Sequence, residues 1–288
     1  METFVAVART GSFAEAARRL NITASAASRR VTRLEAMLAV KLIHRTTRAL
    51  SLTEAGEQFL LHAQSAIASA TNAVDAAKSH HATPQGHLSV HAPMTFGKLH
   101  ISPLVPAFLR LYPSLSIKLS LNDDVPDLLT AGLDVAITAR HISVGSYVAR
   151  RIGTLASVLC ASPDYLRNHG PVTHPRELEA HNCLHYEHPE NASSWTVSRG
   201  DETFEIPVSG NIRSDNIEVV CDAAKAGMGI ARLPRFIADP EIEAGRLVPV
   251  LPDFSMPKRT LFAVYPDRQH KPAKLTAFLD FFIPRLAE

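Results

Sequence analysis

The stretch Thr23–Glu35, with the sequence TASAASRRVTRLE, carries an apolar stripe and a basic stripe at helical spacing. Ala27, Val31 and Leu34 recur at steps of four and three, which places them on one face of a helix. Thr23 is suited to cap this helix, so that the positive helix end would lie near phosphate. We predict a helix that lies in a DNA groove; an ordinary surface helix with solvated arginines is the alternative.

Two further helices are predicted before this stretch. Residues 1–9 carry an apolar stripe that predicts the first of them. The sequence SFAE, which begins at Ser12, fits a capping box and predicts a second helix over residues 13–20. Only a short turn separates that helix from Thr23. Two short helices joined by such a turn, the second one basic, form a helix-turn-helix.

Residues 42–56 follow the basic helix and lack helical periodicity. Their basic tip, RTTR at Arg45–Arg48, lies between strand-like flanks and predicts the β-hairpin of a winged domain. A loop with two solvated arginines is the alternative. Residues 1–58 carry nine Lys and Arg against five Asp and Glu, whereas the rest of the chain carries 21 against 23. The positive charge is therefore concentrated where a polyanion would bind.

A long alanine-rich helix without proline is predicted from Thr53, its N-cap, to about Lys78. Its apolar residues follow a heptad spacing and are called the heptad stripe: Leu60, Ala63, Ile67, Ala70, Val74 and Ala77. This narrow stripe predicts pairing with the same helix of a second copy; packing of a lone helix on the next domain is the alternative. Residues 79–87 are predicted to form a polar hinge, because Pro84 and Gly86 cannot continue the helix.

From Leu88 onward the pattern changes to alternating strands and helices. Strands are predicted at 88–92, 116–121, 134–138, 157–161, 183–186, 203–209, 230–233, 247–251 and 260–265. Helices are predicted at 96–111, 127–131, 164–169, 215–226 and 274–286. The βαβαβ order at the start of this series implies a mostly parallel sheet covered by helices. About 200 residues of this kind indicate two α/β lobes rather than one.

Length, composition and cysteine usage exclude several classes of protein. The 288-residue chain is 46% hydrophobic, as in ordinary globular proteins, and is long enough for two or three domains. Neither a run of about 18 apolar residues nor a signal peptide is present, so we expect a cytoplasmic protein with no membrane partner. Cys160, Cys183 and Cys221 are widely spaced and form no CxxC pair, which predicts reduced, packed thiols.

No metal, cofactor or catalytic site is predicted. His181, Cys183, His185 and His188 lie close in sequence, but a strand over 183–186 would place only Cys183 and His185 on one face. No GxSxG, HExxH or P-loop motif occurs, so no class of enzyme is favoured.

The segments AARRLNIT at Ala16–Thr23 and RTTRALSLTEAG at Arg45–Gly56 resemble the N-terminal domain of LysR-type transcriptional regulators. CASPDYL, AGMGIARLP and GRLVPVL are similar to effector-domain motifs of the same family. The resemblance implies an α+β multidomain fold: an N-terminal winged helix-turn-helix, a long dimerising linker helix and a C-terminal two-lobed α/β domain of the type-2 periplasmic-binding-protein kind, with two crossing strands. It also implies that a small molecule in the cleft adjusts how a tetramer binds and bends promoter DNA and contacts RNA polymerase.

The resemblance places nine residues of this chain at the DNA. Those of the recognition helix are Thr23, Ser25, Ser28, Arg29, Arg30 and Arg33, and those of the wing are Arg45, Thr46 and Arg48. Two positions depart from the family. Ala39 stands where a glycine is usual, and a left-handed conformation there would cost alanine about 1 kcal/mol. Ala27 replaces a commoner valine, which predicts a modest loss of packing.

Open α/β sheets bind ligands at the carboxyl ends of their strands. Four candidates follow the first such strand, at a helix N-terminus whose free amides favour an anion: Pro93, Met94, Thr95 and Phe96. Thr138 and Arg140 follow another strand and replace an arginine and a glycine of the family; Arg140 is either a partner for a carboxylate ligand or a solvated loop charge. Asp215 and Asn216 come from the other lobe, where capping of a helix is the alternative role for Asp215.

These observations favour a sequence-specific transcription factor that binds an inverted-repeat site as a dimer or tetramer and responds to a small, preferably anionic, effector. The predicted division is a DNA-binding domain at 1–56, a linker helix at 57–78, a hinge at 79–87, a first effector lobe at 88–158 with 264–288, and a second at 159–263. A stand-alone small-molecule binding or transport protein is the second hypothesis, and an enzyme is the third.

Overall fold

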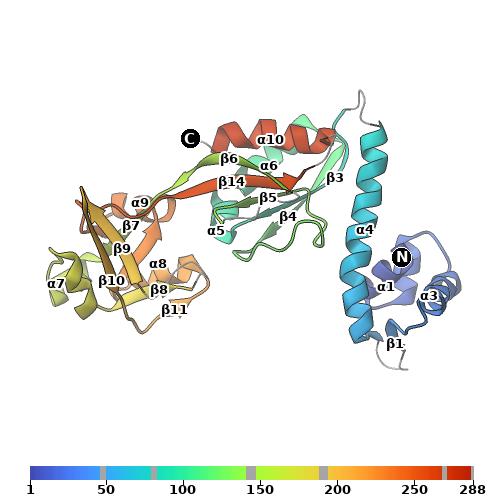
Figure 1. Ribbon diagram of the computed structural model, residues 1–288, viewed down its shortest axis with the longest axis horizontal. Helices are drawn as coiled ribbons and strands as arrows, with labels where there is room; N and C mark the ends of the chain where they lie inside the picture. Colours follow the sequence, from blue (N-terminus) through green and yellow to red (C-terminus); the bar gives the residue numbers. More distant parts are fainter. Residues whose placement is uncertain (46–49, 79–82, 141–146, 188–193, 268–270, 287–288) are drawn as a thin grey trace.

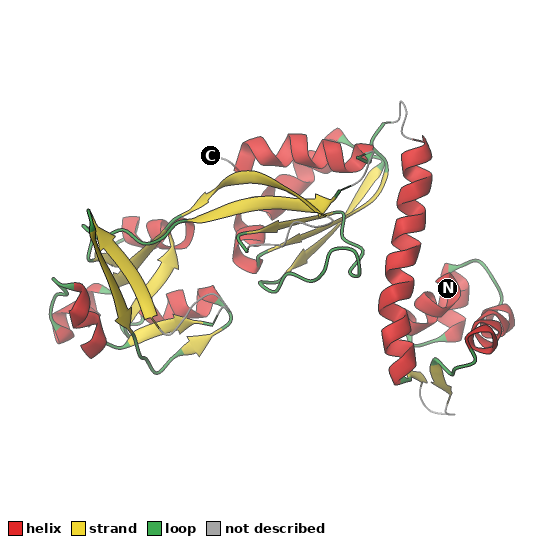
Figure 2. Ribbon diagram, in the orientation of Figure 1, coloured by secondary structure: helices red, strands yellow, loops and turns green. Residues whose placement is uncertain are grey.

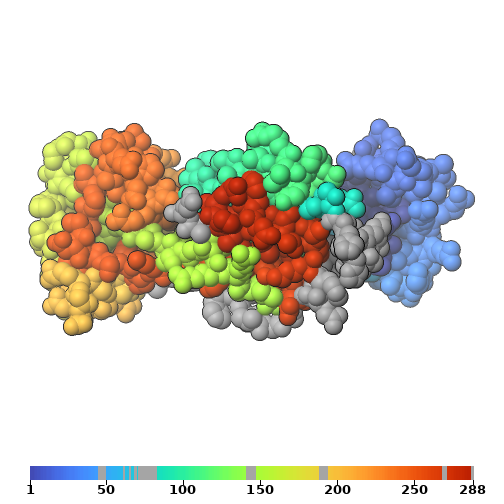
Figure 3. Space-filling view, turned by 90° about the horizontal axis from the view of Figure 1, so that it is seen from above, coloured from blue at the N-terminus to red at the C-terminus, as the bar shows by residue number. Residues whose placement is uncertain are grey.

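The computed structural model describes residues 1–45, 50–78, 83–140, 147–187, 194–267 and 271–286. Three parts lie in a row: an N-terminal domain with a long helix, a central α/β lobe (lobe 1) and a distal α/β lobe (lobe 2) (Figure 1). The N-terminal part is mostly helical, whereas each lobe combines a sheet with helices (Figure 2). Seen from above, the same three parts follow one another along the long axis (Figure 3).

The N-terminal domain consists of three helices followed by a β-hairpin, as a winged helix-turn-helix requires. Its elements are α1 (Glu2–Thr10), α2 (Phe13–Arg19), α3 (Ala24–Leu38), β1 (Ile43–Arg45) and β2 (Leu50–Leu52). The predicted cap of α3 is confirmed, because the Thr23 hydroxyl accepts a hydrogen bond from the Ala26 amide at 3.2 Å. Ser12 caps α2, but Glu15 pairs with arginines of its own helix instead of completing the predicted capping box.

The apolar face of α3 is buried, as its spacing predicts. Ala27 and Val31 are fully buried and Leu34 is nearly so. Val31 and Leu34 share one core with Phe4 of α1 and Leu42, which precedes the wing. Burial of this face leaves the basic face of the same helix on the outside of the domain.

Glu35 joins the buried side of α3 to the start of the wing. Its Oε1 accepts the amides of Leu42 and Ile43 at 3.0 and 3.2 Å, and its Oε2 pairs with Lys41 Nζ at 3.1 Å. Burial by itself raises the pKa of this carboxyl, but these hydrogen bonds hold its pKa below the ordinary value. The carboxylate therefore stabilises the junction between helix and hairpin.

Ala39 ends α3 in the left-handed conformation, with φ 53° and ψ 26°. The family usually has a glycine at this position. An alanine is less favourable in the left-handed conformation, because it carries a Cβ. Ala39, the strained residue, is the point at which the chain leaves α3 towards the wing.

The linker helix α4 runs over Glu54–Lys78 and begins at the predicted cap, since the Thr53 hydroxyl accepts an amide of the first turn at 2.9 Å. Ala63 of the heptad stripe is only 1% exposed and belongs to the core of the N-terminal domain. Leu60 and Ile67 pack against the same core. The first half of the stripe therefore packs on its own chain and is not wholly available to a second copy.

Lobe 1 contains a five-stranded sheet in the order β4-β3-β5-β14-β6. Its elements are β3 (Gly86–Ala92), α5 (Met94–Phe96), α6 (Val105–Leu111), β4 (Leu115–Leu121), β5 (Val135–Thr138), β6 (Tyr147–Leu155), β14 (Arg259–Pro266) and α10 (Ala273–Leu286). Strand β3 is parallel to β4 and β5, as predicted, whereas β14 runs antiparallel to β5 and β6. Helices α6 and α10 lie over the same side of this sheet (Figure 1) and share its core, which includes Phe108 and Phe278.

Lobe 2 contains a five-stranded sheet in the order β11-β8-β12-β7-β13. Its elements are β7 (Ser157–Ala161), α7 (Pro163–His169), β8 (Cys183–Tyr186), β9 (Ser194–Arg199), β10 (Glu202–Pro207), β11 (Arg213–Ser214), α8 (Ile217–Lys225), β12 (Ile230–Pro234), α9 (Arg235–Glu243) and β13 (Val248–Val250). Helices α8 and α9 pack on one face. Helix α7 and the β9–β10 hairpin cover the other. Two separate apolar cores therefore support the sheet.

Strands β6 and β14 connect the two lobes. They run side by side from lobe 1 towards lobe 2 (Figure 1) and pair along their length, from Tyr147 with Pro266 to Leu155 with Arg259. This confirms the two crossing strands that the resemblance implied. Because β6 leads into β7 and β14 follows β13, the chain passes between the lobes once in each direction.

Several predicted elements differ in the structure. Residues 127–131 form a single turn rather than a helix, because the chain turns at Gly132 with φ 64°. The helix predicted over 96–111 is divided into short segments with a π-helical turn at Gly97–Ile101, because its prolines cannot donate helical hydrogen bonds. Strand β3 begins at Gly86, so the last two residues of the predicted hinge pair with β4. Strands β6, β9 and β11 and helix α9 were not predicted.

The left-handed conformation of Ala39 leads to a stability prediction. Ala39→Gly should raise the free energy of unfolding of the N-terminal domain by about 1 kcal/mol, because glycine carries no Cβ. Chemical denaturation followed by circular dichroism measures this. Ala36→Gly, at an exposed position inside the same helix, is the control and should lower that free energy by a similar amount. Equal destabilisation by both changes would contradict the prediction.

The lowered pKa of Glu35 leads to a pH prediction. A carboxyl whose folded pKa lies below its unfolded value of 4.5 stabilises the fold above that pH and loses this contribution as the pH falls. Glu35→Gln should therefore melt at a lower temperature than the unmodified protein at neutral pH, and the difference should shrink below about pH 4.5. The exposed Glu179→Gln serves as control and should differ little at any pH. A Glu35→Gln difference that does not change with pH would refute the assignment.

Candidate functional site

Helix α3 presents a polar, basic face to solvent opposite its buried stripe. The exposed residues on it are Thr23, Ser25, Arg29, Arg30 and Arg33, and Ser28 is half-buried. Among the residues that the structure describes, no carboxylate forms an ion pair with any of these three arginines. Exposed guanidinium groups without an internal counter-ion are suited to contact phosphate and base edges.

The wing begins where the sequence predicted it. Strands β1 and β2 are antiparallel, and Arg45 is opposite Leu50 at the end of the pairing nearest to the tip. The other two predicted contacts of the wing, Thr46 and Arg48, lie outside the described residues. The backbone of Arg45 therefore lies at the base of the basic tip.

A groove with an open volume of about 680 Å³ lies between α1, α3 and α4. Arg30 and Arg33 line it from α3, together with Met37, which is 74% exposed. Ile67 and Ala70 of the heptad stripe line it from α4. The side chains of the last two stripe residues, Val74 and Ala77, are not among those the structure describes.

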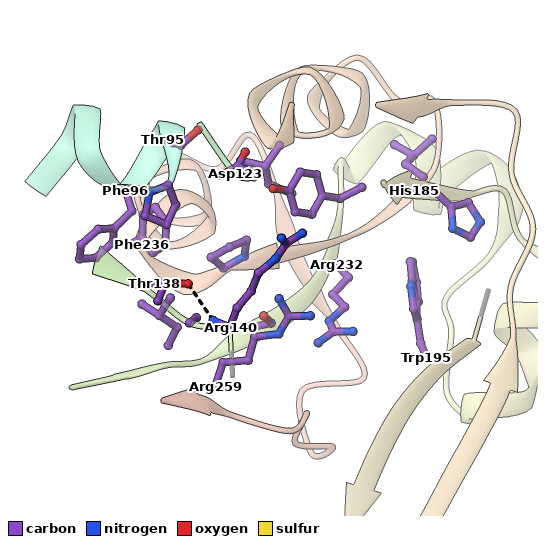
Figure 4. A pocket seen from close by; sticks show the side chains of 18 residues that line it. Thr95, Phe96, Asp123, Thr138, Arg140, His185, Trp195, Arg232, Phe236 and Arg259 are labelled. Carbon is purple, nitrogen blue, oxygen red and sulfur yellow. Dashed lines mark hydrogen bonds between the residues drawn. The ribbon is translucent and has the colours of Figure 1, made fainter. Parts of the chain in front are cut away.

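A cavity lies between the two lobes, where the carboxyl ends of strands from both sheets meet (Figure 4). The volume open to the centre of a water-sized sphere is about 120 Å³. At about 30 Å³ per water in the liquid, this corresponds to about four water molecules, the space for a small molecule. Five of the predicted effector residues line it: Pro93, Thr95, Phe96, Thr138 and Arg140.

The other three predicted effector residues do not line the cavity. Asn216 caps α8, since its Oδ1 accepts a hydrogen bond from the Glu218 amide at 2.8 Å. The alternative role predicted for Asp215, capping of this helix, is therefore wrong by one residue. Asp215 is exposed to solvent. Asn216 Nδ2 lies 3.7 Å from Met94 Sδ, so these two residues join the lobes beside the cavity.

Residues that were not predicted contribute much of the lining. The polar and aromatic ones are Asp123, His185, Tyr186, Trp195, Arg232, Phe236 and Arg259. They come from strands β8, β9, β12 and β14, from helix α9 and from the segment after β4, and the sequence did not show how these elements lie relative to one another. One signal was present, because Arg232 is a charged residue inside the otherwise apolar strand IARLP.

Arg140 is held at the lobe 1 side of the cavity. Its amide donates to Thr138 Oγ1 at 3.0 Å, the bond drawn in Figure 4, and its Nη2 lies 3.3 Å from Asp124 Oδ1. The Asp124 carboxylate is largely exposed, so this ion pair is weak. Arg140 therefore keeps a guanidinium group at the cavity while it is anchored to its own lobe.

Asp123 and Tyr186 meet across the cavity. Asp123 belongs to lobe 1 and accepts the Met94 amide at 3.0 Å, and its carboxylate is also the hydrogen-bond partner of the Tyr186 side chain of lobe 2. Burial and the Asp123 carboxylate raise the pKa of Tyr186 above its ordinary value. The phenol therefore stays protonated and connects the lobes.

Three further contacts join the lobes around the cavity. Lys98 Nζ of lobe 1 lies 3.0 Å from Glu218 Oε2 of lobe 2. Phe96 and His100 of lobe 1 pack edge to face on Phe236 of lobe 2, with ring centroids 5.7 and 5.2 Å away. The structure therefore shows the lobes in contact with each other, with the cavity between them.

The sequence cluster around residue 183 is dispersed in the structure. His181 Nδ1 hydrogen-bonds with the Tyr165 hydroxyl, the Cys183 thiol faces the Leu178 carbonyl and His185 packs beside Trp195. His188 lies outside the described residues. In the described part of the chain, no three His, Cys, Asp or Glu side chains gather where they could hold a metal ion.

The three cysteines are free and buried, as predicted. Burial raises the pKa of the Cys160 and Cys183 thiols to about 12 and that of Cys221 to about 11. Such thiols carry almost no thiolate at neutral pH and are poor nucleophiles. They act as packed apolar groups.

None of the described helices combines the length and apolar character that a membrane crossing requires.

Comparison with known proteins assigns both parts of the chain to one family. Residues 1–57 match the family described as "Bacterial regulatory helix-turn-helix protein, lysR family". Residues 81–287 match the family described as "LysR substrate binding domain". The chain therefore belongs to the LysR family of DNA-binding transcriptional regulators, and it is not an enzyme.

Relatives extend over almost the whole chain. An uncharacterized HTH-type transcriptional regulator of Haemophilus influenzae is 36% identical over 273 residues, or 95% of each chain. The probable regulator LtrA of Klebsiella pneumoniae is 33% identical and covers 96% of this chain and 91% of its own length. Among solved structures, CrgA of Neisseria meningitidis (32% identity, TM-score 0.65) covers 99% of this chain and 97% of its own. The full-length virulence activator AphB of Vibrio cholerae (30% identity, TM-score 0.68) covers 98% and 97%.

Burial of the thiols predicts their reactivity. Under native conditions at neutral pH, a thiol-specific chromogenic reagent should modify Cys160, Cys183 and Cys221 at a small fraction of the rate for a free peptide thiol, because the thiolate form is suppressed and access is blocked. In denaturant all three should react quickly, which provides the control. Rapid native modification of any one thiol would show that it is accessible and contradict this prediction.

Proposed function

We propose that this regulator binds an inverted-repeat promoter site through α3 and the wing, and that a small molecule in the cavity between the lobes changes that binding. One observation carries the proposal. The apolar face of α3 is buried within its own domain, while its basic face is exposed without an ion-paired carboxylate among the described residues.

The proposed DNA contacts divide into two groups. Residues of α3 enter the major groove and read base edges or adjacent phosphates: Thr23, Ser25, Ser28, Arg29, Arg30 and Arg33. Residues of the wing contact the backbone or the minor groove: Arg45, Thr46 and Arg48. Arg29 lies opposite the buried stripe, whereas Arg30 and Arg33 also border the groove beside α4, which makes Arg29 the best candidate for sequence reading.

Regulation is proposed to act through closure of the lobes. A ligand bound by Pro93, Thr95, Phe96, Thr138 and Arg140 on lobe 1 would favour the closed arrangement only if lobe 2 also contacts it. The contacts Asn216–Met94 and Lys98–Glu218 would then form or break when the ligand binds or leaves. Asp215 is exposed beside them. The paired strands β6 and β14 would transmit this change to lobe 1 and the linker.

The proposal includes self-association. The part of the heptad stripe beyond the N-terminal core, Ala70, Val74 and Ala77, would pair with a second copy, while Leu60, Ala63 and Ile67 also support the domain itself. The proposed division of labour keeps the predicted parts: DNA binding at 1–56, linker at 57–78, hinge at 79–87, lobe 1 at 88–158 with 264–288, and lobe 2 at 159–263. The sheets move three of these bounds by a few residues, since β3 begins at Gly86, β7 of lobe 2 at Ser157 and β14 of lobe 1 at Arg259. Pairing of two dimers and contact with RNA polymerase complete the proposal.

Mutations in the two DNA-contact groups should have different effects. Arg29→Ala should weaken binding to the specific site by about 1–3 kcal/mol and reduce discrimination between sequences. Arg45→Ala should weaken binding to specific and random duplexes by similar factors, because a wing contact to the backbone carries no base information. Fluorescence anisotropy with promoter fragments selected from genomic DNA measures both effects.

Arg110→Ala is the matched control, since it removes one exposed positive charge from lobe 1. It should leave DNA affinity unchanged at moderate salt. An equal loss of specificity from Arg29→Ala and Arg45→Ala would contradict the division. Absence of any preference for promoter fragments over random duplex would contradict sequence-specific binding itself.

A further inference from the structure

One guanidinium group at the cavity has no partner in the protein. Arg232 lies on β12 between buried Ala231 and Leu233, is half-buried and lines the cavity from lobe 2. Within the described part of the chain, its side chain forms no ion pair and no hydrogen bond. Burial and the neighbouring positive charge of Arg259 lower the pKa of Arg232 below its ordinary value. A guanidinium group stays charged even so, and a charge held away from water requires an anion beside it.

The other two guanidinium groups of the cavity already have partners. Arg140 pairs with Asp124, whose Oδ1 lies 3.3 Å from its Nη2. Arg259, at the start of β14, also interacts with other residues of the chain. Among the arginines that line the cavity in the described residues, Arg232 therefore leaves one positive charge uncompensated. A ligand with a single negative charge, placed at Arg232, would supply the missing anion.

His185 provides a second, independent sign of a ligand. It lines the same cavity, is only 8% exposed, and its Nε2 has no hydrogen-bond partner. The ring hydrogen-bonds with the backbone of Val208, so its other nitrogen carries the proton. Burial lowers the pKa of the imidazole below its ordinary value, so the ring is uncharged at neutral pH. Nε2 is therefore an unsatisfied acceptor, which requires an O–H or N–H donor and repels a carboxylate.

Arg232 and His185 extend from the same face of the lobe 2 sheet. Strands β8 and β12 are parallel with Leu184 opposite Ala231, so the residues that follow them, His185 and Arg232, share a face. The Trp195 ring lies beside the His185 ring, with centroids 6.4 Å apart, and also lines the cavity. Figure 4 shows these three labelled side chains at one side of the cavity. A cation, an acceptor and an apolar ring are therefore available to one ligand.

Resting on the proposed function, we propose that the effector is a small monocarboxylate whose carbon skeleton also carries a hydroxyl group. Its carboxylate binds the Arg232 guanidinium, and its hydroxyl donates a hydrogen bond to His185 Nε2. A planar guanidinium binds a carboxylate through two hydrogen bonds, and this interaction is strong where water is excluded. The Trp195 indole packs on the carbon skeleton. These contacts come from lobe 2, so a ligand that also touches lobe 1 favours the arrangement in which the lobes are together.

The test compares ligands of matched shape with the full-length protein at neutral pH and equal ionic strength. Calorimetry measures the binding of meta-hydroxybenzoate, para-hydroxybenzoate and β-hydroxybutyrate. Benzoate and butyrate lack the hydroxyl, and the corresponding hydroxy amides lack the charge. At least one hydroxy acid should bind about five-fold more tightly than its unsubstituted acid, the value of one hydrogen bond, and about ten-fold more tightly than its amide, because a charge-assisted pair is lost.

A second negative charge should bring no gain. Isophthalate and terephthalate carry a carboxylate in place of the hydroxyl of the two hydroxybenzoates. They should bind no more tightly than benzoate, because an ionised carboxylate cannot donate to His185 Nε2. Binding of none of the hydroxy acids overturns the proposal. Equal binding of hydroxy acid and unsubstituted acid in every series, or of hydroxy acid and amide, also overturns it.

Two sets of variants should remove the two preferences separately. Arg232→Gln should abolish the preference for acid over amide and keep that for the hydroxyl, whereas Arg232→Lys should retain part of both. His185→Phe should abolish the hydroxyl preference alone, and His185→Gln, which keeps an acceptor, should retain part of it. The matched control is Arg235→Gln, exposed and paired with Asp239 outside the cavity; it should bind as the unmodified protein does. Unchanged preferences in Arg232→Gln and His185→Phe, or loss of both preferences in each together with a lower melting temperature, would show a structural role and overturn the proposal.

Promoter binding separates this inference from the proposed function. A preferred hydroxy acid that leaves promoter affinity unchanged would support the ligand class and contradict regulation by it. A ligand that changes promoter affinity but binds equally well without its hydroxyl or its charge would do the opposite.

Discussion

The pairing of β6 with β14 is the constraint on which the regulatory part of the protein depends. The chain passes between the lobes along these two strands, and their antiparallel hydrogen bonds hold the two passages together. Leu155 and Arg259 are opposite each other at one end of this pair, and both line the cavity. The connection therefore forms part of the cavity wall as well as the link between the lobes. A change in the angle between the lobes must change the shape of the cavity, which is the coupling that a ligand-dependent regulator requires.

The cavity combines features that oppose its own stability. Three guanidinium groups lie around it, and Arg232 has no counter-ion among the described residues. Opposing this repulsion, the lobes hold each other through the Tyr186–Asp123 hydrogen bond, the Lys98–Glu218 ion pair and the packing of Phe236. The closed arrangement of the lobes therefore depends on a few contacts that work against the concentration of positive charge at the cavity. Functional sites commonly keep such locally unfavourable groups.

In the N-terminal domain, the basic helix α3 is held in place by contacts that do not involve the arginines on its outer face. Burial of Val31 and Leu34 fixes the rotation of α3, and the Glu35 carboxylate fixes its end against the wing. These contacts use the inner face alone, so the arginines on the outer face remain available. The linker helix contributes Ala63 to the same core, which means that the orientation of α4 and that of α3 are coupled within one chain.

Features that depend on neighbours in the sequence were determined by the sequence itself. The caps at Thr23 and Thr53, the buried stripe of α3 and the strands that precede Pro93 and Arg140 follow from short-range hydrogen bonds and periodicity. The tertiary structure alone decided the rest of the site. His185, Tyr186, Arg232 and Arg259 are brought together by strand pairing across long stretches of chain, and Asn216 rather than Asp215 became the cap through the exact start of α8. Helix α9, which contains a proline, and β6, which crosses between lobes, likewise owe their conformation to packing that local propensity does not encode.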